Sequence, residues 1–369
     1  MTKDINELFF QLIRVSIGVS GCLSNTPTNE EWKELYDMAK KQSLVGVCFA
    51  SVQRLCNSET GDYCGMNEML YLTWMGMAAK IQQRNEIVNR QCVELQARLS
   101  ADGFQSCVLK GQGVAQQYGE NLSMLRQSGD IDLYVDCGMK KAVEYVQKIA
   151  PTNEVNHKHV QLHVFSDTEV ELHYIPAELH CPWRDKPLQK FFDEWNAVET
   201  VKMPNGQMIV VPCAEFQVVH LLTHAFRHLY GDGIGLRQMM DLYFVLKNMP
   251  TDVDQTAIRR VVEAAGMTRF AEATLWVLQK VFSLSMIGMP WVPNPRNGEF
   301  LLNEIMMAGN FGHHDERINK TGESRWGRFW RVTRQNQRMM RFSASEVLCT
   351  PLWRIWHFVW MRRQGYTQG

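Results

Sequence analysis

The chain has 369 residues, enough for roughly two or three domains, and 45% of them are hydrophobic, enough for sizeable cores. Lysine plus arginine and aspartate plus glutamate number 39 each, so the whole chain lacks the positive excess typical of nucleic-acid-binding proteins. Ten cysteines without a Cys-x-x-Cys pair argue against a metal cluster or a disulfide framework and fit reduced thiols in a cytoplasmic protein. No apolar run reaches about 18 residues, so no membrane span is predicted.

Residues 1–100 are predicted to form a helical N-terminal region. Charged residues are interspersed among the apolar ones from the start, which is typical of an amphipathic helix and not of a signal peptide. Thr28 and Glu31 have the spacing of a capping box and predict the start of another helix. Residues 67–100 are predicted to form one further, long helix, with Gly103 near its C-cap. We expect a packing domain here, and the alternative is a wall of an active cleft.

After this long helix the apolar pattern changes from helical spacing to alternation. Residues 105–109 are predicted to form a strand. The strand is followed by a turn in which Gly111 and Gly113 permit close approach of the backbone. A short helix comes next, and then a polar loop, 119–128, that contains Arg126.

The next predicted strand carries two carboxylates two positions apart. Asp130 and Asp132 alternate with Ile131, Leu133 and Val135. On a strand the two acids therefore share one face, roughly 6.6 Å apart, while the apolar residues enter the core. Because like charges held this close repel each other, the arrangement makes sense if a cation lies between them. A solvated strand face is the alternative.

Two further alternating runs predict a β-hairpin. The first run places the polar residues His157, His159, Gln161 and His163 on one face. Because register follows the buried face, we predict a three-residue turn at 167–169, which pairs Val164 with Leu172. This register sets Glu171 on the same face as the histidines, where a third carboxylate can meet the two aspartates.

The chain resembles the uncharacterised nucleotidyltransferase family of the polymerase-β-type superfamily through four segments: Lys110-Gly111, Arg126, Asp130-Ile131-Asp132-Leu133 and Val170-Glu171-Leu172-His173. The superfamily pattern is a glycine-containing turn, an acidic–hydrophobic–acidic strand and a third carboxylate on a later strand. The resemblance covers mainly 104–175. It implies an α+β fold with a polymerase-β-like nucleotidyltransferase core, a mixed sheet with helices, over 101–211. Helical regions over 1–100 and 212–369 would flank this core.

The resemblance also implies an activity: an NMP unit passes from an NTP, with ATP as the first candidate, to an acceptor hydroxyl, and pyrophosphate is released. It assigns Asp130, Asp132 and Glu171 as catalytic residues that bind two Mg²⁺ ions. Glu171 would hold the ion nearer the acceptor and could also act as a general base. The acceptor stays open between a small molecule, a protein hydroxyl and an RNA end.

Nucleotide binding is assigned to Lys110, Gly111 and Arg126, because fixed positive charge and turn amides suit phosphates. The alternatives are a surface lysine, and a salt bridge from Arg126 to the first aspartate. His173 and His224 are candidates for the acceptor site. A structural, hydrogen-bonded histidine and a simple packed helix are the alternatives for these two.

One residue departs from the superfamily pattern. Most members have a serine after the turn glycine, where it touches the triphosphate, but this chain has Gln112. The departure supports a second hypothesis, a catalytically degenerate nucleotide-binding or interaction module. A third hypothesis, a phosphohydrolase that uses the same carboxylates, would release inorganic phosphate.

The remaining elements are predicted from local signals. An irregular loop is expected over 176–187, and a hairpin over 198–211 that turns at Pro204-Asn205-Gly206. Helices are expected over 214–230 and 236–248, with an Arg237–Asp241 pair on the second, and two or three more lie over 254–312.

A basic, aromatic tail closes the chain. From residue 325 onward it holds nine arginines and a single acid, Glu346, together with several tryptophans and phenylalanines. Three interpretations stay open: packing on the body with the arginines pointing outward, nucleic-acid binding, and contact of 351–363 with a membrane surface.

Overall fold

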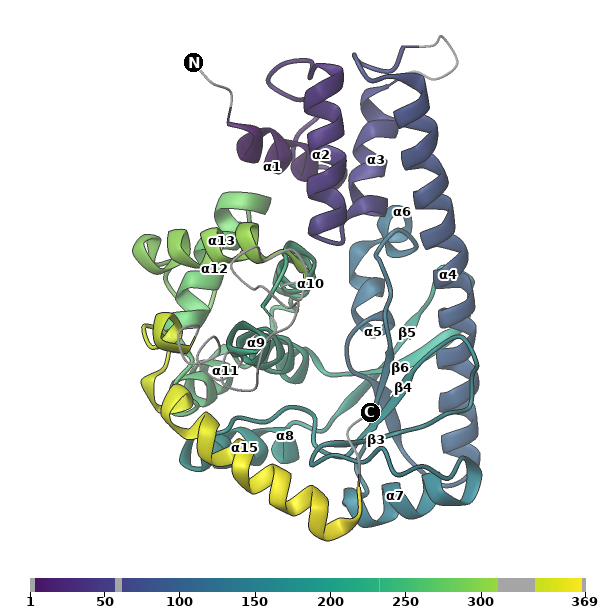
Figure 1. Cartoon of the computed structure of the whole chain (residues 1–369), viewed down its shortest axis with the longest axis vertical. Coiled ribbons are helices and arrows are strands. Elements are labelled where there is room, and N and C mark those ends of the chain that lie inside the picture. Colours follow the sequence, from purple (N-terminus) through teal and green to yellow (C-terminus); the bar gives the residue numbers. More distant parts are fainter. Residues whose placement is uncertain (1–3, 57–61, 232, 311–335, 367–369) are drawn as a thin grey trace, which may run out of the picture.

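The computed structural model describes residues 4–56, 62–231, 233–310 and 336–366 (Figure 1). Helices and a mixed sheet are combined in one α+β chain, as predicted from the sequence. The N-terminal region consists of α1 (Ile5–Ser16), α2 (Asn29–Lys41), α3 (Val45–Leu55) and α4 (Glu68–Ala101). The predicted capping box starts α2, because Thr28 and Glu31 each accept the backbone N–H of the other, at 3.2 and 2.8 Å. The long helix α4 runs from the N-terminal helices down to the sheet (Figure 1).

The sheet has four strands: β1 (Ser106–Val108), β2 (Ile131–Val135), β3 (His159–Gln161) and β4 (Val170–His173). Their order is β1-β2-β4-β3, with β2 and β4 parallel and the two outer strands antiparallel to their neighbours. The sheet is therefore mixed, and its two central strands carry the acidic residues singled out in the sequence.

The predicted register of the β3–β4 hairpin is wrong by four residues. Leu172 lies opposite Val160 and not opposite Val164, so the connection is longer than the predicted three-residue turn. Apolar alternation determines which face a residue occupies but not how long the loop is. Because a shift of four residues is even, every side chain keeps its face, and Glu171 still lies on the face of the histidines.

Helices connect these strands to one another and to a second, two-stranded sheet. They are α5 (Gln112–Ala115), the turn η1 (Gln116–Tyr118), α6 (Glu120–Ser123), α7 (Gly138–Ile149) and α8 (Pro182–Glu194). The hairpin of β5 (Val198–Lys202) and β6 (Met208–Pro212) turns where predicted, with Gly206 at a φ of 81°. Two predicted loops contain helices: α6 lies within 119–128, and α8 begins inside 176–187. Pro182 does not prevent α8, because it occupies the first helical turn, where its missing N–H costs no hydrogen bond.

The C-terminal region is helical, as predicted. Its helices are α9 (Ala214–Tyr230), α10 (Leu236–Lys247), α11 (Gln255–Ala264), α12 (Thr268–Phe282), α13 (Pro295–Ala308) and α15 (Ala344–Gln364). Buried side chains of these helices and of the N-terminal helices form one continuous core. Gln42 joins the two regions, because its side chain donates to the Ile305 carbonyl at 3.1 Å and accepts from the Leu236 amide at 2.8 Å. Within the described ranges, no helix has the length and apolar character needed to cross a membrane.

The last helix, α15, packs on the body with one face only. The ring of Trp353 stacks on His180 with 3.9 Å between ring centroids, and His357 is buried. The opposite face exposes apolar side chains, among them Leu352 and Ile355 at 70% and 63% exposure. Of the basic tail, residues up to 335 lie outside the described residues. Contact of the tail with nucleic acid or a membrane surface stays a prediction.

The two faces of the four-stranded sheet have different roles. Ile131, Leu133 and Val135 of β2 enter a core formed with α7 and the C-terminal half of α4. Tyr134 points to the other face and packs on Phe216 of α9, with 5.9 Å between ring centroids. Since side chains alternate along a strand, Asp132 lies on this second face, between the sheet and the C-terminal helices.

Candidate active site

Three carboxylates converge on the sheet face that is turned toward α9. Asp132 and Glu171 occupy paired positions on the parallel strands β2 and β4, and Asp130 immediately precedes β2. One oxygen from each of the three lies within 4.8 Å of the others. Asp132 is 1% exposed, whereas the other two are half-buried. The arrangement predicted from strand periodicity is therefore present, with the third carboxylate on the neighbouring strand.

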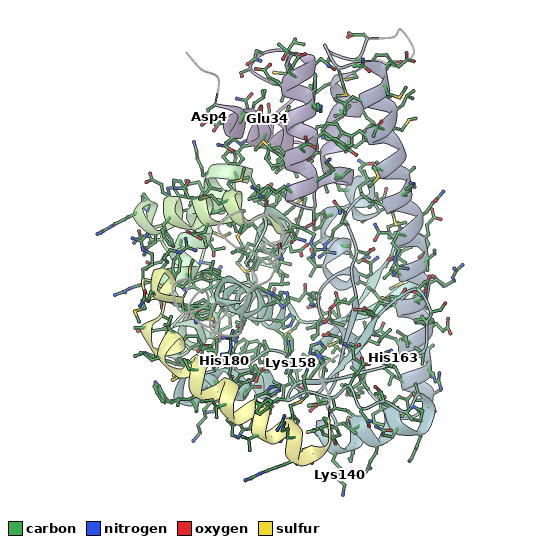
Figure 2. All side chains as sticks on the ribbon, in the orientation of Figure 1. Asp4, Glu34, Lys140, Lys158, His163 and His180 are labelled. Atoms are coloured by element: carbon green, nitrogen blue, oxygen red, sulfur yellow. The ribbon has the colours of Figure 1, made fainter. Side chains whose placement is uncertain are left out.

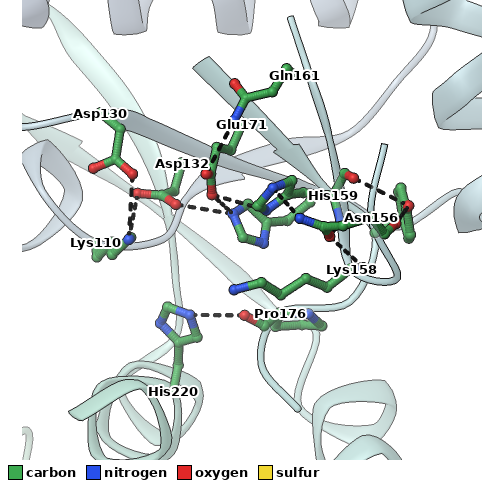
Figure 3. A network of polar contacts seen from close by, with 12 residues as sticks. Lys110, Asp130, Asp132, Asn156, Lys158, His159, Gln161, Glu171, Pro176 and His220 are labelled. Atoms are coloured by element: carbon green, nitrogen blue, oxygen red, sulfur yellow. Dashed lines mark hydrogen bonds and ion pairs between the residues drawn. The ribbon is translucent and has the colours of Figure 1, made fainter. Parts of the chain in front are cut away.

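Lys110 supplies positive charge to this acidic cluster. Its ammonium lies 3.2 Å from Oδ2 of Asp132 and 3.6 Å from Oδ2 of Asp130 (Figure 3). Burial alone would lower the pKa of Lys110, but the nearby carboxylates outweigh burial and raise it. Lys110 is thus a charged member of the cluster and not a surface lysine.

Two histidines hold Glu171 from its other side. Nε2 of His173 lies 3.0 Å from both Asp132 Oδ1 and Glu171 Oε2, and Nδ1 of His159 lies 2.9 Å from Glu171 Oε2. Burial would raise the pKa of Glu171, but hydrogen bonds from the two histidines lower it overall. The pKa of His173 is raised, because its two carboxylate partners outweigh burial. His173 therefore links two of the carboxylates, which accords with the alternative of a structural histidine.

The turn after β1 depends on two glycines. Gly111 has a φ of 58°, which favours glycine, and a Cβ on Gly113 would lie 2.4 Å from the Val108 carbonyl oxygen. The side chain of Gln112 is buried and donates to Asn85 Oδ1 at 3.2 Å and to Asn89 Oδ1. Both asparagines belong to α4. Gln112 thus anchors the turn to α4, and its side chain points away from the acidic cluster.

Arg126 is held by Asp241 and not by Asp130. Its guanidinium makes two contacts of 2.7 Å with the Asp241 carboxylate, which also accepts the Tyr118 hydroxyl at 2.7 Å. Arg237, the partner predicted for Asp241, donates to the Gln127 carbonyl at 3.0 Å. Arg126 nevertheless lines a small cavity beside the acidic cluster, together with Lys110 and Gly111.

Three cavities surround the cluster. The turn cavity, about 30 Å³, is lined by residues that include Lys110, Gly111, Arg126, Asp130, His224 and Arg237. The basic cavity, about 290 Å³, is lined by residues that include Lys110, Asp132, Lys158, His173, His224 and Arg227. The strand cavity, about 340 Å³, includes Lys158, His159, Gln161, Glu171 and His357 in its lining. His224 faces two of these cavities, so its position on α9 suits a role in the cleft.

Sequence reasoning missed several residues of this cleft. His159 was placed on the correct strand face, and its alternation with Gln161 was the signal that could have identified it. Lys158 alternates with His157 and His159 in the sequence, which predicts the opposite strand face for it, but β3 begins only at His159, so alternation does not apply to Lys158. Arg227 lies on α9, far from the motif in the sequence, and no local signal marks it.

The donor set of the cluster fits a divalent cation. Carboxylate oxygens are the preferred ligands of Mg²⁺, and the three acids provide them within a compact, partly buried space. His159, Glu171 and His173 form a second group with the same spacing, in which imidazole nitrogens join one carboxylate. Imidazole is better suited to transition metals than to Mg²⁺, so the first group is the better Mg²⁺ site.

Comparison with known proteins identifies the family of the chain. A solved structure described as an antigenic nucleotidyltransferase-like protein from Paracoccidioides brasiliensis shares 13% identity with this chain. That similarity covers 57% of this chain and 95% of the other, with a TM-score of 0.30. No curated protein matches the sequence significantly. The sequence profile described as "Uncharacterised nucleotidyltransferase" matches residues 28–283, well over half of the chain, and the protein therefore belongs to this uncharacterised nucleotidyltransferase family.

Proposed function

We propose that the protein is a metal-dependent nucleotidyltransferase that moves an NMP from an NTP to an acceptor hydroxyl. The observation that carries the proposal is the convergence of Asp130, Asp132 and Glu171 within 4.8 Å, on two adjacent parallel strands and the residue that precedes the first of them. In the reaction the acceptor oxygen bonds to the α-phosphorus, the bond from that phosphorus to the leaving pyrophosphate breaks, and the hydroxyl proton passes to solvent.

The three carboxylates would hold two Mg²⁺ ions. When bound, these ions would neutralise charge on the phosphates and lower the pKa of the acceptor hydroxyl. Asp132 lines the basic cavity, Asp130 lines the turn cavity, and Glu171 lines the strand cavity. The lowered pKa of Glu171 keeps it ionised, so Glu171 serves better as a cation ligand than as a general base.

The NTP, with ATP as the first candidate, would place its phosphates beside the Gly111 turn. Lys110 stands at the junction of the turn cavity and the acidic cluster, where its ammonium can contact a phosphate oxygen. Arg126 adds positive charge to the same wall, although Asp241 already holds its guanidinium. Arg126 therefore shapes and charges the wall, and Lys110 is the more direct phosphate ligand.

The test is incubation of the purified protein with each α-³²P-labelled NTP, Mg²⁺ and a cell extract, followed by fractionation. We expect one NTP to transfer its label to a single fraction, with release of pyrophosphate and complete loss of transfer in EDTA. Release of inorganic phosphate from the NTP would indicate a phosphohydrolase. Absence of both transfer and metal-dependent NTP binding would contradict the proposal and favour a degenerate module.

A further inference from the structure

The cavities around the acidic cluster differ in size. The turn cavity, which Gly111 and Asp130 line, has about 30 Å³, whereas the basic cavity, which Asp132 lines, has about 290 Å³. Asp132 lines the basic cavity and Glu171 lines the strand cavity next to it. If the phosphates of the nucleotide lie at the turn, the space beyond these two carboxylates belongs to the acceptor.

The basic cavity carries an excess of fixed positive charge. Lys110, Lys158, Arg227 and Arg354 line it, against the carboxylates Asp132 and Glu178. Lys110 pairs with Asp132 at 3.2 Å, and Arg227 pairs with Glu346 on α15. Glu178 contacts His157 at 2.9 Å. At least two of the four cations are therefore partly compensated by carboxylates, but four cations against two carboxylates still leave the lining positive.

Lys158 is the cation best placed to meet a ligand. No ion pair to its ammonium is found in the part of the chain that the structure describes, and its side chain lines both the basic and the strand cavity. The ammonium points toward the space between Lys110 and His220 (Figure 3). Lys158 and His180 lie in the interior between the sheet and α15, whereas Lys140 projects from the lower end of the molecule (Figure 2).

Arg227 lines the same cavity and is held in place by a residue of α15. Its guanidinium pairs with the carboxylate of Glu346, which also accepts the His180 amide at 2.7 Å. Glu346 belongs to α15 and is 1% exposed, so the C-terminal helix holds Arg227 in place. The guanidinium also contacts the His180 ring, and the Arg227 side chain lines the cavity with 21% of its surface exposed.

Burial and the nearby cations lower the pKa values of two histidines that line the cavity. Burial lowers the pKa of His180, and nearby Arg227 lowers it further. Burial and then Lys110 lower the pKa of His224 well below its ordinary value. Both rings are therefore neutral near pH 7. The ring nitrogens of His180 already contact the Thr350 hydroxyl, at 2.9 Å, and the Arg227 guanidinium, so His224 is the ring of the two that can donate to a ligand. An anionic group in the cavity would thus meet cations and one neutral donor.

We infer that the acceptor is a small anionic molecule, a hydroxyl compound whose phosphate or carboxylate group is bound between Lys158 and Arg227. This inference rests on the proposed function, because it names the substrate class of the same site. Lysine and arginine bind phosphate and carboxylate through charge-assisted hydrogen bonds. A volume of about 290 Å³ suits a small molecule. The acceptor hydroxyl would then lie beside Asp132 and Glu171, where transfer takes place.

The experiment uses inorganic phosphate as the probe. The full chain is saturated with Mg²⁺ and the non-reactive analogue α,β-methylene-ATP, and phosphate is then titrated in a calorimeter. We expect phosphate to bind while the nucleotide is bound. Lys158→Met should weaken phosphate binding by about tenfold or more, through loss of a charge-assisted contact, and leave nucleotide affinity unchanged. Lys190→Met, on the exposed surface of α8, is the matched control and should behave as wild type.

Several results would overturn the inference. Competition between phosphate and the nucleotide would assign the basic cavity to the NTP, and equal binding by wild type and Lys158→Met would remove the anion site. In the transfer assay, label that ends on RNA, on protein or on a neutral small molecule would also contradict it. Phosphate binding that depends on Lys158, in a protein without any transfer, would instead contradict the proposed function and retain the anion site.

Discussion

Arg126 and Asp241 form a two-pronged ion pair, with both contacts at 2.7 Å, between segments 115 residues apart. Their side chains are only 5% and 6% exposed. The pair joins the loop before β2 to α10, so it connects the region of the four-stranded sheet to the C-terminal helices beside the turn cavity. Burial would lower the pKa of Arg126, but Asp241 outweighs burial and raises it, which keeps the guanidinium charged.

Removing the charge of Asp241 should destabilise the protein strongly. Asp241→Asn leaves Arg126 charged and buried without its partner, which should lower the free energy of unfolding by about 3–5 kcal/mol. Urea unfolding monitored by circular dichroism measures this change. Asp37→Asn, which breaks the exposed ion pair with Lys40, is the control and should have little effect. Equal effects of the two substitutions would show that the buried pair does not stabilise the fold.

Restoring a serine after the turn glycine should not improve activity. Gln112→Ser removes the hydrogen bonds to Asn85 and Asn89 and should cost about 1–3 kcal/mol of stability, because buried amides lose their partner. The transfer rate should stay the same or fall, since the side chain at this position faces α4. Gln53→Ser, at an exposed position of α3, is the control. A higher transfer rate in Gln112→Ser would favour the hypothesis of a degenerate site.

The buried histidine His220 should make stability depend on pH. Burial lowers its pKa from 6.5 to about 3, and its Nε2 donates to the Pro176 carbonyl at 3.1 Å. Between these pH values the unfolded chain binds a proton that the folded protein does not. Stability is therefore complete above pH 6.5 and falls as the pH decreases, by up to about 1.4 kcal/mol per pH unit from this residue.

His220→Gln tests this linkage, because glutamine can donate to the same carbonyl without titrating. Urea unfolding at a series of pH values between 4.5 and 7.5 should give a shallower slope for the variant than for wild type. Parallel slopes would show that His220 does not titrate differently in the folded and unfolded states. His163→Gln, at an exposed position, is the matched control.

Local patterns in the sequence were sufficient to predict which residues form the acidic face of the sheet. Strand alternation places Asp130 and Asp132 on one face, and it places Glu171 on the matching face of a later strand even though the hairpin register is wrong. The helix over 214–230 and the hairpin around Gly206 were also predicted, because each carries its own periodicity or turn residues. These features depend on residues close together in the chain.

Features that depend on distant segments were not predictable in this way. The partners of Arg126 and Gln112 lie on helices far away in the sequence, and a single ion pair or amide contact leaves no periodic signal. Arg227 and Lys158 enter the cleft only because α9 and the start of β3 pack on either side of it. α8 was missed because its prolines resemble those of a loop, although Pro182 suits the first turn of a helix.

Replacement of Asp132 tests the central claim most directly. Asp132→Asn keeps the size of the side chain and removes one carboxylate from the cluster, while Asp136→Asn removes an exposed carboxylate just beyond the same strand. The measurement is transfer of label from α-³²P-NTP, with circular dichroism to verify folding. We expect Asp132→Asn to reduce transfer by about a hundredfold or more and Asp136→Asn to leave it unchanged. Undiminished transfer by a folded Asp132→Asn variant would contradict the account.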